Sequence, residues 1–387
     1  MNYPQGLNFV FRFPTKIVFG PGTAKELGME VDELKRSRAL IVTDRDLAQT
    51  DLVKMVQKAL GKRCVGIFSD VVPDTGLQIV NAGAECGRQL EADILVSVGG
   101  GSVIDTAKGM AICLAKGGKL EDYAGFNILT GPITPHIVIP TTAGTGSEVT
   151  YAAIIKDHEQ KRKLLFADNY LFPNVAILDP LMTVGLPRLM TAATGMDALS
   201  HCVEAIHSRQ SEPVADGLAL HGIRMIRKYL PQAVENGGDI VARGQMLIAA
   251  CIAGAAFSNA QVGMVHALAH SVGAKFGVPH GIANSILLPH CILYNREACL
   301  ERYSEIAQTM GRDVRGMEPL KAAEQAAVAI REFSKSIGMP QTLKEVNVEE
   351  SGLDECANDA LMDGSIVYNP RLVFDPDEIL KVLKNAF

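Results

Sequence analysis

The strongest constraint on the fold is the alternation of strand-like and helix-like segments in the first half of the chain. Short apolar runs occupy residues 38–44, 64–68, 93–98, 136–140 and 175–178. Segments with helical spacing of apolar residues lie at 24–34, 52–60, 76–90 and 103–115. A run that is apolar at every position is typical of a strand covered on both faces. The alternation therefore predicts a parallel sheet with helices on both faces.

The remaining segments of this half are less regular. Residues 9–20 are rich in Phe, Val and Ile and are expected to form strands. Apolar residues at 151–155 and 164–166 flank a charged, turn-like stretch at 157–162.

The pattern changes near residue 186. The later segments all have helical spacing or helix-former composition, and no convincing strand follows: 188–207, 213–230, 240–257, 261–275, 282–294, 298–309, 318–337 and 376–386. A chain of 387 residues is long enough for two domains. We therefore expect an α/β Rossmann-like domain over residues 1–186 and an all-α domain over residues 187–387.

Composition excludes several classes of protein. The net charge is −6, Trp is absent, and the densest basic cluster is the tripeptide at 161–163, so nucleic acid is not expected as a partner. The first residues lack a basic region followed by an apolar core, so no signal peptide is expected. The longest apolar run, 246–257, is too short to span a bilayer. The 8 cysteines are scattered without Cys-x-x-Cys spacing, which favours reduced thiols in a cytoplasmic protein.

Three glycines, Gly99, Gly100 and Gly101, stand between a predicted buried strand and a predicted helix. Backbone amides at a helix start favour an anion, and glycine lets phosphates approach the backbone closely. The run lacks Gly-x-Gly-x-x-Gly spacing and follows about the fourth strand, not the first. It indicates either a dinucleotide pyrophosphate site or an ordinary tight turn.

Two further features fit a nucleotide. The stretch 140–150 follows a predicted strand and carries four threonines and two glycines, whose hydroxyl and amide groups suit a phosphate or ribose. An ordinary Thr/Gly loop has the same composition. Asp44 ends another predicted strand, where a carboxylate accepts hydrogen bonds from a ribose diol and repels a 2′-phosphate, which favours NAD over NADP. The alternative for Asp44 is a helix N-cap.

Histidines cluster in the second half of the chain. His266, His270 and His280 fall within 15 residues of a chain that has 9 histidines. His266 and His270 are four residues apart and so share one helix face. Gly277 and Pro279 are expected to end that helix, so that His280 opens the next segment.

A second pair with the same spacing lies upstream. Asp197 and His201 are four residues apart, and with His266 and His280 they provide one carboxylate and three imidazoles. This set suits ferrous iron or zinc. The alternatives are that Asp197 complements a helix start capped by Thr194, and that His201 is a core histidine. His270 shares the helix face of His266, but we assign it the role of a proton relay beside the metal instead of that of a ligand.

Four stretches together resemble the iron-containing alcohol dehydrogenase family, in its bacterial branch of lactaldehyde reductase, 1,3-propanediol dehydrogenase and NAD-dependent methanol dehydrogenase. They are Gly99–Lys108 (GGGSVIDTAK), Pro140–Glu148 (PTTAGTGSE), Ala193–His201 (ATGMDALSH), and His266-x-x-x-His270 followed by His280-Gly281. The resemblance covers nearly the whole chain, in the order and spacing of the family. It implies a Rossmann-like dinucleotide-binding domain, a helical metal-binding catalytic domain, and hydride transfer between NAD and a small primary alcohol, diol or aldehyde.

The resemblance also implies roles for single residues. The metal ligands would be Asp197, His201, His266 and His280, with ferrous iron expected first and zinc as the alternative. The cofactor residues would be Asp44, Gly99, Gly100, Gly101, Ser102, Asp105, Thr141, Thr142, Thr145, Thr150 and Lys163. Asp105 would lie near the nicotinamide and, with His270, take part in catalysis. A homodimer or larger homo-oligomer is expected by analogy.

Two other activities are compatible with a similar scaffold. A lyase like dehydroquinate synthase would need a basic pocket for a phosphorylated acid, and no such cluster stands out in the sequence. A hydroxyacid–oxoacid transhydrogenase would keep its cofactor bound through the reaction, so that turnover would not depend on added NAD.

Overall fold

The computed structural model describes Tyr3, residues 6–160 and residues 162–387. The chain divides into two compact units. One is Phe13–Leu186, and the other joins Pro187–Phe387 with the described part of Met1–Arg12. The first residues join the helical unit through hydrogen bonds: the Tyr3 hydroxyl donates to Asp216, and the Arg12 backbone N–H donates to Asn259 Oδ1.

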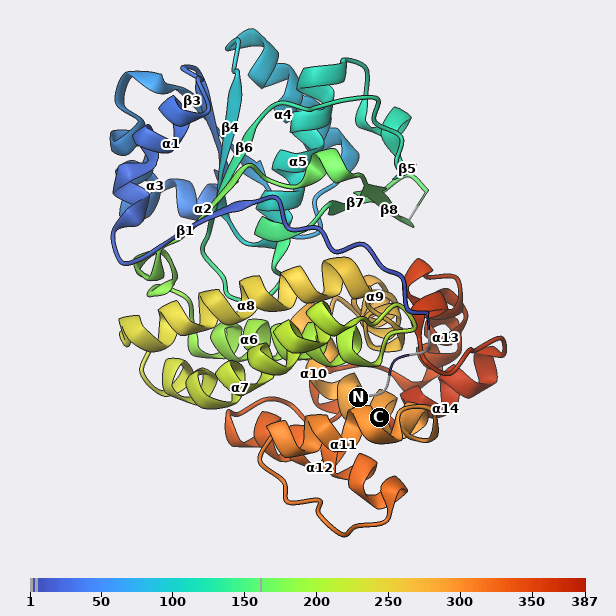
Figure 1. Ribbon diagram of the computed structural model, residues 1–387. Coiled ribbons are helices and arrows are strands. Elements are labelled where there is room, and N and C mark those ends of the chain that lie inside the picture. The colour runs from blue at the N-terminus through green and yellow to red at the C-terminus, as the bar shows by residue number, and fades with distance from the viewer. Residues whose placement is uncertain (1–2, 4–5, 161) are drawn as a thin grey trace. The chain divides into compact units, whose positions relative to one another are not determined.

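The unit Phe13–Leu186 is built on a six-stranded sheet (Figure 1). Its strands, in spatial order, are β1 (Lys16–Phe19), β9 (Val175–Leu178), β6 (His136–Pro140), β4 (Ile94–Gly99), β2 (Ala39–Asp44) and β3 (Cys64–Val71). Every neighbouring pair is parallel, which confirms the predicted parallel sheet.

Helices cover both faces of this sheet. Successive side chains of a strand point to opposite faces, so alternate residues of each strand lie in different cores. Ile41 of β2 packs with α1 (Leu27–Glu33) and α3 (Asp51–Leu60). Leu40, its neighbour in the same strand, packs in the other core with α4 (Leu77–Gln89) and α5 (Gly101–Lys116). Burial on both sides explains why these strands are apolar throughout.

Smaller elements complete this unit. A three-stranded sheet contains β5 (Gly125–Phe126), β8 (Arg162–Ala167) and β7 (Ala152–Asp157), and the short helix α2 (Arg45–Ala48) follows β2. Strands β7 and β8 pair antiparallel across the charged turn that the sequence indicated.

The prediction of strands throughout residues 9–20 is wrong for most of that stretch, since only Lys16–Phe19 is a strand. Phe9 and Val10 are 43% and 70% exposed. Their composition favours a strand, but a strand also needs a hydrogen-bonded neighbour, and none of the described strand pairings includes them.

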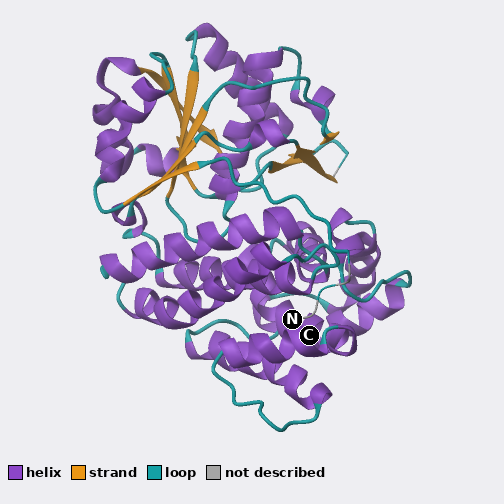
Figure 2. Ribbon diagram, viewed as in Figure 1, coloured by secondary structure: helices purple, strands orange, loops and turns teal. Residues whose placement is uncertain are grey.

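The second unit is helical, and none of its described residues belongs to a strand (Figure 2). Its helices are α6 (Arg188–His207), α7 (Pro213–Glu235), α8 (Ile240–Ala260), α9 (Met264–Phe276), α10 (His280–Asn295), α11 (Leu300–Thr309), α12 (Pro319–Ser336), α13 (Leu353–Leu361) and α14 (Pro376–Ala386). Helices α6, α7 and α8 pack against one another, and α10 packs against α6, α9, α12 and α14. The sequence reading missed α13, which is short.

Among the described residues, α8 is the one helix long and apolar enough to cross a membrane by length and composition. However, 67% of its most apolar window is buried in the protein, and the core helix of a soluble protein passes the same test.

Candidate functional site

Three helices bring the predicted metal ligands together. Asp197 and His201 lie one turn apart in the middle of α6, His266 lies in the first turn of α9, and His280 is the first residue of α10. Because α6 begins at Arg188, Thr194 is inside the helix, and Asp197 does not complement a helix start. The break at Gly277–Pro279 separates α9 from α10, as predicted.

The donor atoms converge on one point. Asp197 Oδ1 lies 3.5 Å from His280 Nε2, 3.7 Å from His266 Nε2 and 4.0 Å from His201 Nε2. Donors about 2.0–2.2 Å from a tetrahedral metal are separated from one another by roughly 3.3–3.6 Å. The ligand atoms of Asp197, His201 and His266 all lie within 4.8 Å of one another; His280 approaches Asp197 but is not a member of this group. The side chain of His280 is more open, at 37% exposed.

The charge and burial of these residues fit a cation. Asp197, His201 and His266 are buried, and His201 stacks on the ring of Phe257 at 4.1 Å. One carboxylate and three imidazole nitrogens are borderline ligands that suit ferrous iron or zinc. The donor set thus fits the divalent metal that the resemblance implies.

The carboxylate and imidazole groups of this cluster shift one another's pKa values. Burial opposes ionisation of Asp197, but the charges of His201 and His280 and the hydrogen bond of His266 hold its pKa well below the ordinary value. Burial likewise opposes the charged form of His266, but the charge of Glu204 and hydrogen bonds to both carboxylates raise its pKa to about 10. A cation that takes the place of these protons makes metal affinity depend on pH.

Two residues beside the ligands were missed in the sequence. Asn284 Nδ2 donates to Asp197 Oδ1 at 2.6 Å, and Glu204 binds His266 Nδ1. Asn284 follows His280 by four residues, and Glu204 follows His201 by three, so both occupy the helix faces of the ligands. That spacing is the signal by which a sequence reading could find them.

His270 lies beside this cluster and has a partner of its own. Its Nδ1 lies 2.8 Å from Asp363 Oδ2, and its ring stacks on that of His280 with centroids 5.3 Å apart. Asp363 was not singled out in the sequence, since it is 93 residues further along the chain.

The glycine turn occupies the carboxyl end of β4. Strand β2 pairs with β4 on one side and β3 on the other, so the chain order reverses between β2 and β4. Ligands of open α/β sheets bind at such a switch point, at the carboxyl ends of the strands. Gly100 is the N-cap of α5, whose first residues are Gly101 and Ser102. Here the dipole of a 16-residue helix favours an anion.

The threonine loop packs directly on this turn. The Thr141 backbone N–H donates to Gly99 O at 3.1 Å. A Cβ on Gly100 would lie 3.2 Å from Thr142 Oγ1, and one on Gly101 would lie 2.9 Å from Thr145 Cγ2. The glycines therefore permit close contact between two loops that both follow parallel strands.

Further along the loop, a buried lysine holds Thr150. Lys108 Nζ donates to Thr150 O at 2.8 Å, to Thr150 Oγ1 at 3.0 Å and to Ala152 O at 2.8 Å. Burial lowers the pKa of Lys108 to about 8, although the charges of Asp105 and Glu148 oppose that change.

The other predicted cofactor residues lie in the same unit. Asp44 ends β2 at the switch point, and its Oδ1 accepts the Leu47 backbone N–H at 2.8 Å, so Asp44 is also the N-cap that the alternative reading described. Asp105 Oδ2 accepts the Ile154 N–H at 3.0 Å, and burial raises the pKa of Asp105. Lys163 Nζ lies 3.5 Å from Asp74 Oδ1.

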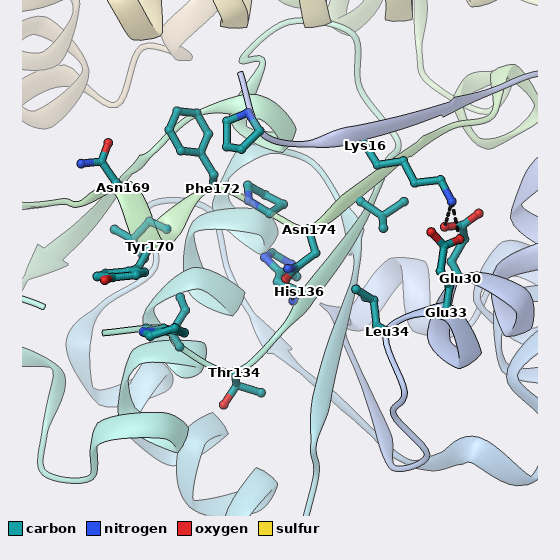
Figure 3. A pocket seen from close by; sticks show the side chains of 16 residues that line it. Lys16, Glu30, Glu33, Leu34, Thr134, His136, Asn169, Tyr170, Phe172 and Asn174 are labelled. Carbon is teal, nitrogen blue, oxygen red and sulfur yellow. Dashed lines mark hydrogen bonds and ion pairs between the residues drawn. The ribbon is translucent and has the colours of Figure 1, made fainter. Parts of the chain in front are cut away.

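A pocket of about 340 Å³ lies elsewhere in this unit (Figure 3). It includes the first residues of three strands, Lys16, His136 and Val175, and so lies at the amino edge of the sheet, away from the glycine turn. None of the predicted site residues lines it.

One unit has a doubly wound sheet with a glycine turn at its switch point, and the other has a buried Asp/His cluster. This combination is typical of a metal-dependent oxidoreductase that uses a nucleotide cofactor. Comparison with known proteins narrows this class to a family. Residues 14–180 match the family model described as "Iron-containing alcohol dehydrogenase", and residues 191–387 match "Fe-containing alcohol dehydrogenase family, C-terminal".

Individual relatives agree with these matches. The chain is 40% identical to NAD-dependent methanol dehydrogenase of Bacillus methanolicus, over 97% of this chain and 99% of the relative. It is 40% identical to 1,3-propanediol dehydrogenase of Klebsiella pneumoniae, over 98% and 99%. The crystal structure of a 1,3-propanediol oxidoreductase superposes with a TM-score of 0.95 at 39% identity, over 98% of this chain and 100% of that chain.

The chain belongs to the iron-containing alcohol dehydrogenase family. The resemblance inferred from the four sequence motifs is thereby confirmed. Because these relatives are alcohol and diol dehydrogenases, the lyase and transhydrogenase alternatives are not favoured.

Proposed function

We propose that the protein catalyses the reversible oxidation of a small primary alcohol or diol to the aldehyde, with NAD as hydride acceptor, at a divalent metal. The convergence of Asp197, His201, His266 and His280 carries the proposal. Full-length similarity to dehydrogenases of methanol and 1,3-propanediol supports the substrate class.

The four converging residues would hold the metal, which when bound supplies a Lewis acid that stabilises negative charge on the substrate oxygen. Asp197 and the imidazoles contribute their Nε2 and carboxylate donors from three helices of one unit. The Asn284 hydrogen bond orients Asp197, and the ring of Phe257 covers one face of His201 and helps to exclude water. Ferrous iron is the expected metal and zinc is the alternative.

The cofactor would lie at the switch point of the sheet, where NAD supplies the hydride-accepting ring. Gly99, Gly100, Gly101 and Ser102 would bind the pyrophosphate through the amides of the turn and of α5. Asp44 would accept hydrogen bonds from the ribose diol and exclude a 2′-phosphate. The remaining residues assigned to the cofactor are Asp105, Thr141, Thr142, Thr145, Thr150 and Lys163, and Asp105 is assigned to the nicotinamide end.

His270 would take the proton that the alcohol oxygen loses. Its Nδ1–H donates to Asp363, which leaves Nε2 as the basic nitrogen and fixes the plane of the ring. The pair follows the usual arrangement of a general base with a carboxylate behind it.

We also propose a role for each domain, a cellular compartment and an oligomeric state. Residues 1–186, whose compact unit is Phe13–Leu186, would serve as the dinucleotide-binding domain, and residues 187–387 as the metal-binding domain. The protein would act in the cytoplasm as a homodimer or larger homo-oligomer, without nucleic acid or membrane as a partner.

The test is a screen of short primary alcohols, diols and aldehydes with purified protein loaded anaerobically with Fe²⁺ or with Zn²⁺. The expected result is metal-dependent formation of NADH from added NAD, lost after chelation and restored by metal. Turnover that needs no added NAD but requires an oxoacid acceptor would instead indicate a transhydrogenase. Full activity after complete removal of metal would contradict the proposal.

A further inference from the structure

Glu204 is a buried carboxylate without a role in the proposed mechanism. It is 0% exposed and lies on α6, three residues after His201 and seven after Asp197. Residues at this spacing share one helix face. Glu204 therefore extends the face of α6 that carries two of the four proposed ligands.

Both carboxylate oxygens of Glu204 bind α9. Oε2 accepts a hydrogen bond from His266 Nδ1, and Oε1 accepts the Val265 backbone N–H at 2.8 Å. The first amides of a helix have no partners within the helix, so the second bond also satisfies the start of α9. A Cβ on Gly263 would lie 3.4 Å from Oε1, at ordinary van der Waals distance.

These contacts determine how His266 is presented. A ring that donates Nδ1–H to a carboxylate keeps its lone pair on Nε2 and has a fixed orientation. His266 Nε2 then points toward His201 Nε2 at 2.9 Å and Asp197 Oδ1 at 3.7 Å. Glu204 thus acts on the ligand cluster without contributing a donor to it.

The negative charge of Glu204 also contributes to the electrostatics of the metal site. A buried carboxylate is costly unless it is paired with positive charge. Asp197 and Glu204 together carry two negative charges, which a divalent cation among neutral imidazoles balances. Removal of the carboxylate would keep the four ligand side chains but would leave the charge of the cation undercompensated.

We propose that Glu204 is a positioning residue for the metal, which orients His266 from behind and balances the charge of the cation. This inference rests on the metal assignment in the proposed function. Glu204 is expected to set the affinity for the metal, since loss of such an outer partner typically weakens metal binding by about 10- to 100-fold.

The experiment measures the dissociation constant for Zn²⁺ by competition with a chromophoric chelator, on wild type, E204Q and E212Q. Gln has nearly the shape of Glu and still accepts a hydrogen bond from Val265. Glu212 is the matched control because it is also buried and caps α7 through the Val214 and Ala215 amides. We expect the Kd to rise at least tenfold in E204Q and to stay within twofold of wild type in E212Q.

The absorption spectrum of bound Co²⁺ provides a second readout, and the band of E204Q is expected to differ from that of wild type because one imidazole is no longer oriented. A folded E204Q with the wild-type Kd and spectrum would overturn the inference. If E204Q does not fold, E204A is measured. It removes both the charge and the acceptor for His266 Nδ1, and an unchanged Kd in folded E204A would equally overturn the inference. Failure of the wild type to bind Zn²⁺ or Fe²⁺ would instead remove the metal assignment itself.

Discussion

His201 Nε2 and His266 Nε2 lie 2.9 Å apart, although the two residues come from different helices and are separated by 65 positions in the chain. Two nitrogen lone pairs this close repel each other unless a proton or a cation lies between them. The carboxylate of Asp197, at 3.7 Å from His266, supplies negative charge at the same point. The relationship between these two rings therefore underlies the assignment of a metal centre.

The approach of α10 to α6 should control metal affinity through Gly281, which follows His280. A Cβ there would lie 2.3 Å from the carbonyl oxygen of Ala193 in α6. We expect Gly281→Ala to push the helices apart, to lower the free energy of unfolding by about 1–3 kcal/mol, and to weaken Zn²⁺ binding. Urea unfolding and chelator competition check this. Gly217→Ala, where a Cβ meets nothing within 4 Å, is the control and should leave metal affinity unchanged. Equal metal affinity in both variants would count against the close approach.

His270, to which we assign the role of proton relay, should matter for turnover but not for metal retention; its Nδ1 is paired with Asp363. Loss of a general base typically costs about 10²–10⁴ in rate. We expect a fall of that order in kcat for His270→Ala, with bound metal per chain unchanged, and a smaller fall for Asp363→Asn. Metal analysis and steady-state kinetics on the same preparations separate these effects. Loss of metal from His270→Ala would show that His270 is a ligand and that the assignment is wrong.

Asp44 should set the preference between NAD and NADP. Both Asp44→Gly and Asp44→Asn remove the charge that repels a 2′-phosphate, and Asn retains the ability to cap α2. We expect the ratio of kcat/KM for NAD to that for NADP to fall at least tenfold in both variants. If Gly changes the ratio and Asn does not, the effect comes from the helix cap and not from the charge.

His136 should make the stability of the protein fall in acid. Burial, aided by the charge of Lys108, lowers its pKa from the ordinary 6.5 to about 3, and its Nε2 lies 2.8 Å from Ser97 Oγ. Between these two pKa values the unfolded chain binds the proton and the folded chain does not. Stability from this group is therefore complete above pH 6.5 and is lost as pH falls toward 3, by up to about 1.4 kcal/mol per pH unit.

The measurement compares urea unfolding of wild type and His136→Asn from pH 7.5 to pH 4.5. Asn does not titrate, so the free energy of unfolding of the variant should fall less steeply with acid. Parallel curves for the two proteins would mean that His136 is not held neutral in the fold.

The sequence predicted the parts of the fold whose pattern is local. Strand β2 is apolar at nearly every position because both of its faces are buried, and this could be read directly. Phe9 and Val10 have the composition of a strand, but strand formation depends on a pairing partner far away in the chain. The nine-residue helix α13 was missed, since a short polar helix is stabilised by packing more than by its own period.

In the candidate site, too, local spacing was predictable from the sequence and contacts between distant segments were not. The spacing of Asp197 and His201 indicates a shared face on one helix, and α6 has both residues on that face. His266 and His270 have identical spacing, so spacing alone does not say which of them faces Asp197. Helix packing decides this: His266 meets Asp197 and Glu204, while His270 meets Asp363. Contacts between helices also explain why Glu204 and Asn284 were not recognised.

The most direct test compares wild type with His266→Ala, with metal content and NAD-dependent alcohol oxidation measured on the same samples after loading with Fe²⁺ or Zn²⁺. We expect about one metal ion per chain and metal-dependent NADH formation in the wild type. In the variant we expect the loss of both, with the fold retained by circular dichroism. A folded His266→Ala protein that keeps its metal and its full activity would contradict the account.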